Sequence, residues 1–356
     1  MKVLIDILTP KQCMLFSKLS ENLEERGHQV FKTTRKYREV NQLLSLKKVD
    51  AIVVGEHGGG TLSEKLRASS RRILELAAVF EDIKPDVTVS FSSPEMARAA
   101  YGLKVPHICI NDSPHAEAVA RLTVPLSEEL MTPMVIPKSA WTRFGIGPER
   151  IVRYNALDPW AWLRGFEPDE GIVDELGMDT TKPVVTFRPE ETFAAYLLGK
   201  TRNETSVVPI IDGLLDARHD LQIVAVPRYD EHVRSLKGIF KDRIFVAKSV
   251  VDGPSLLHRS AVFIGAGGTM SAEAALLGVP TFSCYPGESF LVERYLIRKK
   301  LVVRETDPEK IVAMILNILD NYDHEKRKWR KRALKLVSTY EDPIKVIAEE
   351  VENTDK

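Results

Sequence analysis

Short apolar segments alternate with helix-like segments along most of the chain, and this alternation limits the possible folds more than any other feature. The segment "KVLIDIL" (residues 2–8) is a nearly continuous apolar run, which is typical of a parallel strand buried on both faces. The segment "KQCMLFSKLSENLEERG" (11–27) has apolar residues at helical spacing, and "HQVFKTT" (28–34) has the pattern of a strand. Strand, helix and strand in this order build a parallel sheet, so we predict an α/β fold.

The length and texture of the chain predict two domains. With 356 residues, the chain is longer than a single hydrophobic core usually supports. Residues 155–183 are rich in proline and turn formers, which indicates a connection, and alternation resumes with "PVVTF" (183–187). We therefore expect domains at 1–160 and 161–322, followed by a helical tail at 323–356 that returns to the first domain.

Composition excludes several classes of function. Lys plus Arg and Asp plus Glu both number 50, so overall charge gives no reason to expect a nucleic acid partner. Three widely spaced cysteines argue against structural zinc and for a reducing compartment. The N-terminus lacks a signal-peptide pattern, and no apolar run reaches the ~18 residues of a membrane span. We expect a soluble, cytoplasmic protein.

A basic run at residues 326–332 surrounds Trp329 and allows two interpretations. It could contact an anionic membrane surface. However, Trp329, Ala333 and Leu336 fall on one helical stripe, which favours a packed helix whose charges face solvent.

The segment "AVFIGAGGTMSAEAALLGVP" (261–280) has glycines after a strand and before a short helix. A dinucleotide fingerprint would need glycine at Met270, and a phosphate-binding P-loop would need a Gly-Lys-Ser/Thr sequence, so neither motif is present. A helix N-terminus that Thr269 or Ser271 caps can still attract an anion, and Glu273 can accept hydrogen bonds from a ribose diol. The alternative is an ordinary glycine-rich turn.

The spacing of Glu273, Gly278 and Pro280 resembles the nucleotide-sugar signature of GT-B enzymes, which include UDP-N-acetylglucosamine 2-epimerase. Longer segments, among them "SSPEMARAAYGLKVPHICINDSPHAEAVARL", "IVRYNALDPWAWL" and "VVTFRPEE", resemble the domain of unknown function 354 family in order along the chain. The resemblance implies two Rossmann-like domains facing across a cleft. It assigns the nucleotide sugar to Arg188, Gly267, Gly268, Thr269, Glu273, Pro286 and Gly287.

Polar residues in the first domain are candidates for the chemistry. The segment "NDSPHAEAV" (111–119) follows a strand, and the carboxyl ends of strands in open α/β sheets face the ligand. His115 is our first candidate for a general base and Asp112 the second. The epimerases that the chain resembles have an "HGDT" turn, which is replaced here by "SFSSPE" (90–95), without an Asp. Glu117 is the closest acidic counterpart in this chain to their catalytic carboxylates. Alternatively, these residues form a helix cap and a polar first turn.

Two further loops are candidates for the acceptor side. The loop "GEHGGGT" (55–61) contributes His57, Gly58 and Gly59, and the first turn after a strand contributes Thr9 and Lys11. The chain has no D-x-D pair, which fits metal-independent transfer in which a helix dipole and basic side chains neutralise the leaving diphosphate.

These observations predict a metal-independent GT-B glycosyltransferase that uses a nucleotide-diphosphate sugar as substrate and needs no cofactor. One alternative is an enzyme like UDP-N-acetylglucosamine 2-epimerase, and another is a non-catalytic nucleotide-sugar-binding protein. The nucleotide base, the sugar, the acceptor and the oligomeric state stay open.

Overall fold

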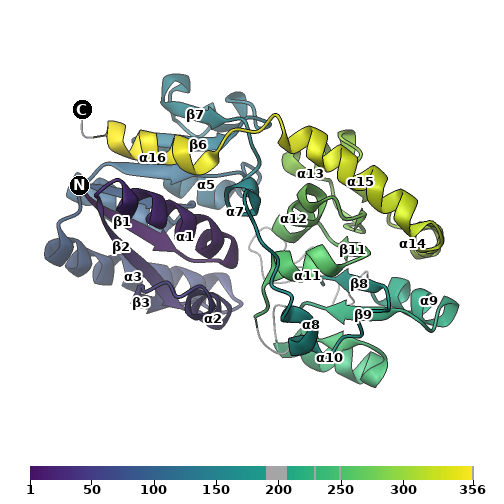
Figure 1. The fold of residues 1–356 in the computed structure, drawn as a ribbon. Coiled ribbons are helices and arrows are strands. Elements are labelled where there is room, and N and C mark those ends of the chain that lie inside the picture. Colours follow the sequence, from purple (N-terminus) through teal and green to yellow (C-terminus); the bar gives the residue numbers. More distant parts are fainter. Residues whose placement is uncertain (190–206, 228–229, 248–249, 355–356) are drawn as a thin grey trace. The chain divides into compact units, whose positions relative to one another are not determined.

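The computed structural model describes residues 1–189, 207–227, 230–247 and 250–354, and the chain divides into two compact units. The first unit comprises Met1–Trp162 with Glu341–Lys356, and the second comprises Leu163–Tyr340. Each unit has one parallel sheet covered by helices, which confirms the prediction of two Rossmann-like domains (Figure 1). The observed boundary after Trp162 lies close to the one after residue 160 that the sequence texture indicates.

The sheet of the first unit has seven strands in the order β3-β2-β1-β4-β5-β6-β7, all parallel. The chain builds outward from β1 to β3 and then restarts on the other side of β1 with β4. Strand order therefore reverses between β1 and β4, where open α/β sheets hold their ligands. The strands are β1 Lys2–Ile7, β2 Gln29–Lys36, β3 Ile52–Glu56, β4 Val87–Ser90, β5 His107–Ile110, β6 Glu129–Pro133 and β7 Ile151–Tyr154.

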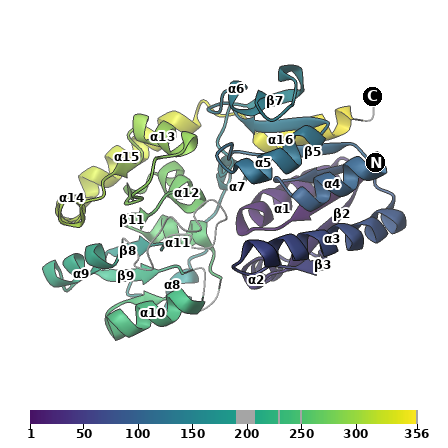
Figure 2. The ribbon, with the colours of Figure 1, turned by 180° about the vertical axis from the view of Figure 1, so that it is seen from behind.

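Helices cover both faces of this sheet. Helices α1, α2 and α16 lie on one face, and α3 and α4 lie on the other, as the front and rear views show (Figure 1, Figure 2). The sequence patterns above do not predict α2. The helices are α1 Pro10–Glu25, α2 Arg38–Leu46, α3 Leu62–Ile83, α4 Pro94–Leu103, α5 Glu117–Thr123, α6 Ser139–Thr142, α7 Trp160–Leu163 and α16 Pro343–Asn353.

Local sequence explains where the first-unit helices begin and end. Thr9 caps α1 by accepting from the backbone N–H of Gln12, and Gly27, with a φ of 88°, follows its last turn. Thr61 and Glu64 form a reciprocal capping box at the start of α3. The loops that precede both helices therefore have defined end points, and both loops carry candidate site residues.

A buried ion pair crosses the α3 and α4 face of the first sheet. Asp6 of the central strand β1 is fully buried, and Arg72 of α3 donates to both of its carboxylate oxygens at 2.5 and 2.9 Å. Arg72 also donates to the carbonyl of Val54, and Thr33 donates to Asp6 at 2.8 Å. Burial by itself would raise the pKa of Asp6, but Arg72 outweighs it and holds the pKa below the usual range.

The second unit contains a six-stranded parallel sheet in the order β10-β9-β8-β11-β12-β13. Here the order reverses between β8 and β11. The elements are α8 Ile172–Leu176, β8 Val184–Phe187, α9 Val208–Ala217, β9 Gln222–Ala225, α10 Asp230–Phe240, β10 Phe245–Val246, α11 Gly253–Arg259, β11 Val262–Gly265, α12 Thr269–Leu277, β12 Thr281–Ser283, α13 Leu291–Arg298, β13 Val303–Arg304, α14 Pro308–Asp320 and α15 Tyr322–Val337.

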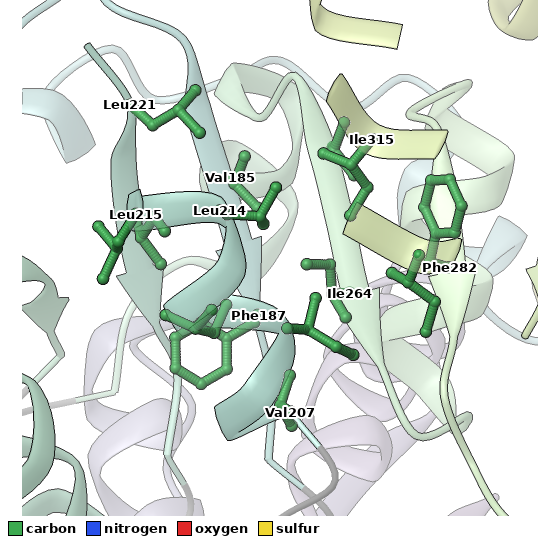
Figure 3. Packing of buried hydrophobic residues seen from close by; sticks show 14 of the residues in the cluster. Val185, Phe187, Val207, Leu214, Leu215, Leu221, Ile264, Phe282 and Ile315 are labelled. Carbon is green, nitrogen blue, oxygen red and sulfur yellow. The ribbon is translucent and has the colours of Figure 1, made fainter. Parts of the chain in front are cut away.

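Alternating strand residues of the second unit enter two different cores. Val185 and Ile264 pack with α9 and α14, whereas Val184 and Phe263 pack with α8, α11 and α12. Figure 3 shows the first core, in which Leu214 of α9 and Ile315 of α14 lie together with Val185 and Ile264 of the strands. Burial on both faces explains why these strands are continuous apolar runs rather than alternating ones.

We expected the whole helical tail, residues 323–356, to return to the first domain, but only its last part does so. Helix α15 belongs to the second unit, where its buried Trp329 and Ala333 lie on the predicted stripe. Only residues 341–356 join the first unit, where α16 packs on α1. Pro343 starts α16 behind its N-cap Asp342, so the proline separates two helices. Within the described parts of the chain, no helix is long and apolar enough to cross a membrane.

We predict that Ile315→Ala destabilises the second unit by about 2–5 kcal/mol, because Ile315 is fully buried and its removal leaves a cavity. The neighbouring Met314, which is 40% exposed on the same helix, provides the control. Met314→Ala should change stability by about 0.5 kcal/mol or less. Urea unfolding followed by circular dichroism measures both, and equal losses would contradict the core assignment.

Candidate functional site

The glycine turn of the second unit lies at the point where its strand order reverses. Strand β11 ends at Gly265, and α12 begins at Thr269. Gly267 and Gly268 have φ values of 82° and 88°, in the left-handed region that favours glycine. The turn therefore needs glycine for its backbone path.

No side chain of the described residues caps the N-terminus of α12, which corrects the expectation that Thr269 or Ser271 caps it. Gly268 holds the N-cap position, and Thr269 is already the first helical residue. Ser271 is buried, and its hydroxyl makes no hydrogen bond to any part of the chain that the structure describes. The first backbone N–H groups of the helix are thus not satisfied by a side chain, and such a helix end favours an anion.

The structure brings other predicted donor residues to the same edge of the sheet. Arg188 follows β8 directly, and its Nη1 lies 3.8 Å from the sulfur of Met270 in the first turn of α12. Glu273 lies one turn further along α12 and is 7% exposed. Pro286 and Gly287 follow β12, the neighbour of β11, and the Gly287 carbonyl accepts from Arg304 at 2.8 Å. Glu190 and Glu191 of the motif "VVTFRPEE" lie outside the described residues.

One acidic residue beside the glycine turn was not predicted from the sequence. Glu293 of α13 is buried and accepts from the hydroxyl of Ser283 at 2.5 Å. A Cβ placed on Gly267 would lie 3.4 Å from its Oε1, so this carboxylate borders the turn. No local motif marks Glu293, because it reaches the turn from a helix that follows a different strand.

Gly278 fixes the end of α12. Its φ of 77° is in the left-handed region, and a Cβ there would lie 2.7 Å from the Cα of Arg330 in α15. Both the helix end and the close approach of α15 therefore need glycine. The Gly-x-Pro element of the signature thus has a packing role in this unit.

Lys11 of the first unit forms ion pairs with two carboxylates at the carboxyl ends of the strands. Its Nζ lies 2.5 Å from Asp112, which follows β5, and 2.6 Å from Asp158, which follows β7. The ring of Phe91, after β4, lies 4.1 Å from the same nitrogen. Asp158 also accepts from the Tyr154 hydroxyl. Four strand ends of the first sheet thus contribute to one cluster, which we call the Lys11 cluster (Lys11, Phe91, Asp112, Tyr154 and Asp158).

The two carboxylates of the Lys11 cluster have different proton affinities. Burial raises the pKa of Asp158 to about 6, although Lys11 opposes the shift and Asp112 adds to it. For Asp112 burial also favours the neutral acid, but Lys11 outweighs it, so the pKa lies below the usual range. The pKa of Lys11 is raised, because its two carboxylates outweigh the burial that would lower it. The cluster thus holds Asp112, which stays ionised near neutral pH, and Asp158, which takes up a proton near pH 6.

Polar contacts fix the loops that carry the Lys11 cluster. Gln12 is buried, accepts from the N–H of Leu8 and donates to the carbonyl of Phe91 at 3.0 Å, so it ties the loops after β1 and β4 together. Ser92 has a φ of 57°, which is uncommon outside glycine, and it donates to the carbonyl of Ile110 at the end of β5. The side chains at this edge are therefore held by their own loops.

The other predicted residues of the first unit occupy different surroundings. His115 lies three residues beyond Asp112, and burial lowers its pKa although Asp112 acts in the opposite direction. Glu117 pairs with Arg121 on the exposed surface of α5, at 2.7 Å. His57 stacks on Tyr37 with ring centroids 4.8 Å apart, while Gly58 and Gly59 continue its loop.

Asp158 and Tyr154 are site candidates that the sequence analysis missed. They lie in "IVRYNALDPW", a segment interpreted only as family resemblance and domain connection. The available signal was the strand "IVRY", because polar residues after any parallel strand reach the same edge as those after β5. No group of three or more His, Cys, Asp or Glu side chains could hold a metal ion among the residues that the structure describes.

The family assignment follows from comparison of the whole chain with known proteins. The family described as protein of unknown function (DUF354) matches residues 1–356. The chain belongs to this family. The predicted resemblance is thereby confirmed, and a DUF354 relative is the uncharacterized protein MJ0665 of Methanocaldococcus jannaschii. It is 32% identical over 322 residues, which cover 88% of this chain and 90% of the relative.

Solved structures resemble this DUF354 chain in fold. The UDP-GlcNAc 2-epimerase of Neisseria meningitidis, solved with UDP-GlcNAc, superposes with a TM-score of 0.75 at 17% identity, over 99% of this chain and 100% of that one. The glycotransferase of kitacinnamycin superposes with a TM-score of 0.61 at 14% identity, over 99% and 98%. At such identities the likeness shows the GT-B fold of the DUF354 chain and leaves its chemistry to its own residues.

We predict that Asp158 makes the folded state less stable as pH rises from about 4 to about 7. In this range the folded state keeps a proton that an unfolded aspartate loses, so the free energy of unfolding falls with rising pH. The Asp158→Asn variant has no such proton to keep. Over this pH range the free energy of unfolding of the wild type should therefore fall, relative to that of the variant, by on the order of 3 kcal/mol. Urea unfolding at several pH values measures the difference. Asp82→Asn, at an exposed position of α3, is the control and should follow the wild type.

Proposed function

We propose that this protein is a GT-B glycosyltransferase that uses a nucleotide-diphosphate sugar and works without a metal ion. The observation that carries the proposal is the meeting, within the second unit, of the uncapped α12 N-terminus, Arg188 and Glu273. Backbone N–H groups and a guanidinium suit a diphosphate, and a carboxylate suits a ribose diol. Two structures of similar fold support parts of this proposal, since one is an epimerase bound to UDP-GlcNAc and the other is a glycotransferase.

The Lys11 cluster would supply the chemistry on the acceptor side. A base removes the proton of an acceptor hydroxyl, the oxygen bonds to the anomeric carbon of the sugar, and the nucleotide diphosphate leaves. Asp112 is the more exposed of the two carboxylates on Lys11, with 21% of its side chain accessible against 1% for Asp158. We assign Asp112 as the base, with His115 as the alternative, and Asp158 and Lys11 as residues that position it.

Epimerisation of a sugar nucleotide is the second candidate. It is favoured by two carboxyl groups of different pKa on one lysine, because epimerisation needs an acid and a base. The expectation that Glu117 faces the sugar gains no support from its exposed ion pair with Arg121. A non-catalytic nucleotide-sugar-binding protein would keep the second-unit site and show no turnover.

We predict that one nucleotide among UDP, GDP and CMP, or its sugar, stabilises the protein against heat. At 100 times its Kd a ligand adds about 2.7 kcal/mol. Glu273→Gln should weaken that ligand about tenfold or more, because it replaces a charged hydrogen-bond acceptor. Glu309→Gln, at an exposed position in the first turn of α14, is the control and should bind as the wild type does. Thermal shift and titration calorimetry measure both, and no response to any nucleotide would rule out all three functions.

We predict that Asp112→Asn lowers kcat by about 10²- to 10⁴-fold and leaves the Kd of the nucleotide unchanged, since a general base contributes to the chemical step. Glu117→Gln is the matched control and should keep kcat. Turnover of the sugar nucleotide identified above, with product analysis, measures these effects and separates transfer from epimerisation. Loss of activity in Glu117→Gln with retention in Asp112→Asn would contradict the assignment of the chemistry to the Lys11 cluster.

A further inference from the structure

Arg35 lies on the same face of the first sheet as the buried Asp6–Arg72 ion pair. Alternate residues of β2 share a face, so Thr33, Arg35 and Tyr37 align there at and just beyond the end of the strand. Thr33 donates to Asp6, which identifies this face as the one that α3 covers. Arg35 is thus placed near the carboxyl edge, two residues beyond the ion pair.

The Arg35 side chain is partly buried, and one of its guanidinium nitrogens has no acceptor among the described residues. Its Nε is buried, and no described residue accepts a hydrogen bond from it. The nearest aromatic contact places the guanidinium carbon 5.9 Å from the Tyr37 ring. Buried arginine donors normally have acceptors, because their removal from water is otherwise unfavourable.

The acidic groups near Arg35 are already engaged. Asp6 receives both hydrogen bonds from Arg72. Glu95 accepts from Ser93 and lies 4.0 Å from Arg72. Burial lowers the pKa of Arg35, and Arg72 adds to the shift, although Glu95, Asp6 and Tyr37 oppose it. The two carboxylates therefore balance the charges of Arg35 and Arg72, but the hydrogen bonds that they accept come from residues other than Arg35.

The loop after β3 adds a flat surface, and Lys65 in the first turn of α3 adds a second cation. His57 stacks on Tyr37, and its Nδ1 accepts from the N–H of Gly59 at 3.2 Å, so Nε2 carries the proton of the neutral ring. Burial, then Arg35 and Lys65, lower the pKa of His57 to about 4. A Cβ on Gly58 would lie 2.5 Å from the Cα of Lys65, so glycine lets this loop approach the first turn of α3.

We propose that Arg35, with Lys65 and the Tyr37–His57 pair beside it, binds an oxyanion of the acceptor substrate, either a phosphate or a carboxylate. This inference rests on the proposed transfer function and specifies the class of its acceptor. The planar guanidinium of Arg35 suits two oxygens of one anion. The stacked rings offer a flat surface for the part of the acceptor next to the anion.

The test uses the full chain with inorganic phosphate and malonate as probes, at constant ionic strength. An Arg188→Gln background removes the arginine of the second-unit anion site. In this background we expect one probe to bind, and Arg35→Gln to weaken it about tenfold or more. Arg71→Gln, at an exposed neighbour of Arg72 on α3, makes the same charge change and should leave binding unaltered. Lys65→Gln should give a smaller loss.

The outcomes distinguish this site from a structural arginine and from the donor site. Without an anion, Arg35→Gln should unfold at the same temperature as the wild type or above it, since it removes a partly buried charge whose Nε has no acceptor among the described residues. Nucleotide affinity, measured for Arg35→Gln in a chain that keeps Arg188, should equal that of the wild type. If neither probe binds, or if binding persists in Arg35→Gln, the proposal is overturned even where nucleotides bind. If a probe binds at Arg35 but no nucleotide binds, the donor assignment fails instead.

Discussion

Helices on both faces of each parallel sheet bury its central strands. Strands β4 and β11 are buried at every position, and candidate site residues gather where the strands end. Asp6 is an exception inside the first sheet, and Arg72, Thr33 and the packing of α3 compensate for its charge. The position of the chemistry therefore follows from the way in which the sheets are buried.

Strand order reverses once in each sheet, and the residues at each reversal form a different candidate site. In the first unit, residues after β1, β4, β5 and β7 form the Lys11 cluster, which is rich in carboxylates. In the second unit, residues after β8, β11 and β12 give an edge with an arginine and a helix N-terminus that no described side chain caps. The same topology thus places paired carboxylates at one reversal and a basic residue beside a helix N-terminus at the other, because the residues at the strand ends differ.

Much of the fold was predictable because its signals are local. The apolar strands, the helix stops at Gly27 and Gly278 and the stripe around Trp329 each depend on neighbours in sequence. Helix α2 and the division of the tail into α15 and α16 were less clear, since the assignment of a helix to a unit depends on what it packs against. The predicted cap of α12 was wrong, because several neighbouring residues were able to cap the helix and the observed N-cap is Gly268.

The candidate site was predictable only in part, and the reason is distance along the chain. The sequence by itself determined the strand-to-helix turns, and so it named Lys11, Asp112, Arg188 and the glycines as separate candidates. Tertiary structure alone decided that Lys11 joins Asp112 to Asp158 and that Glu293 borders Gly267. It also decided that the Arg35 Nε is buried with no acceptor among the described residues. Sequence patterns record which residues follow each strand, whereas charge pairing depends on which strands become neighbours when the sheet assembles.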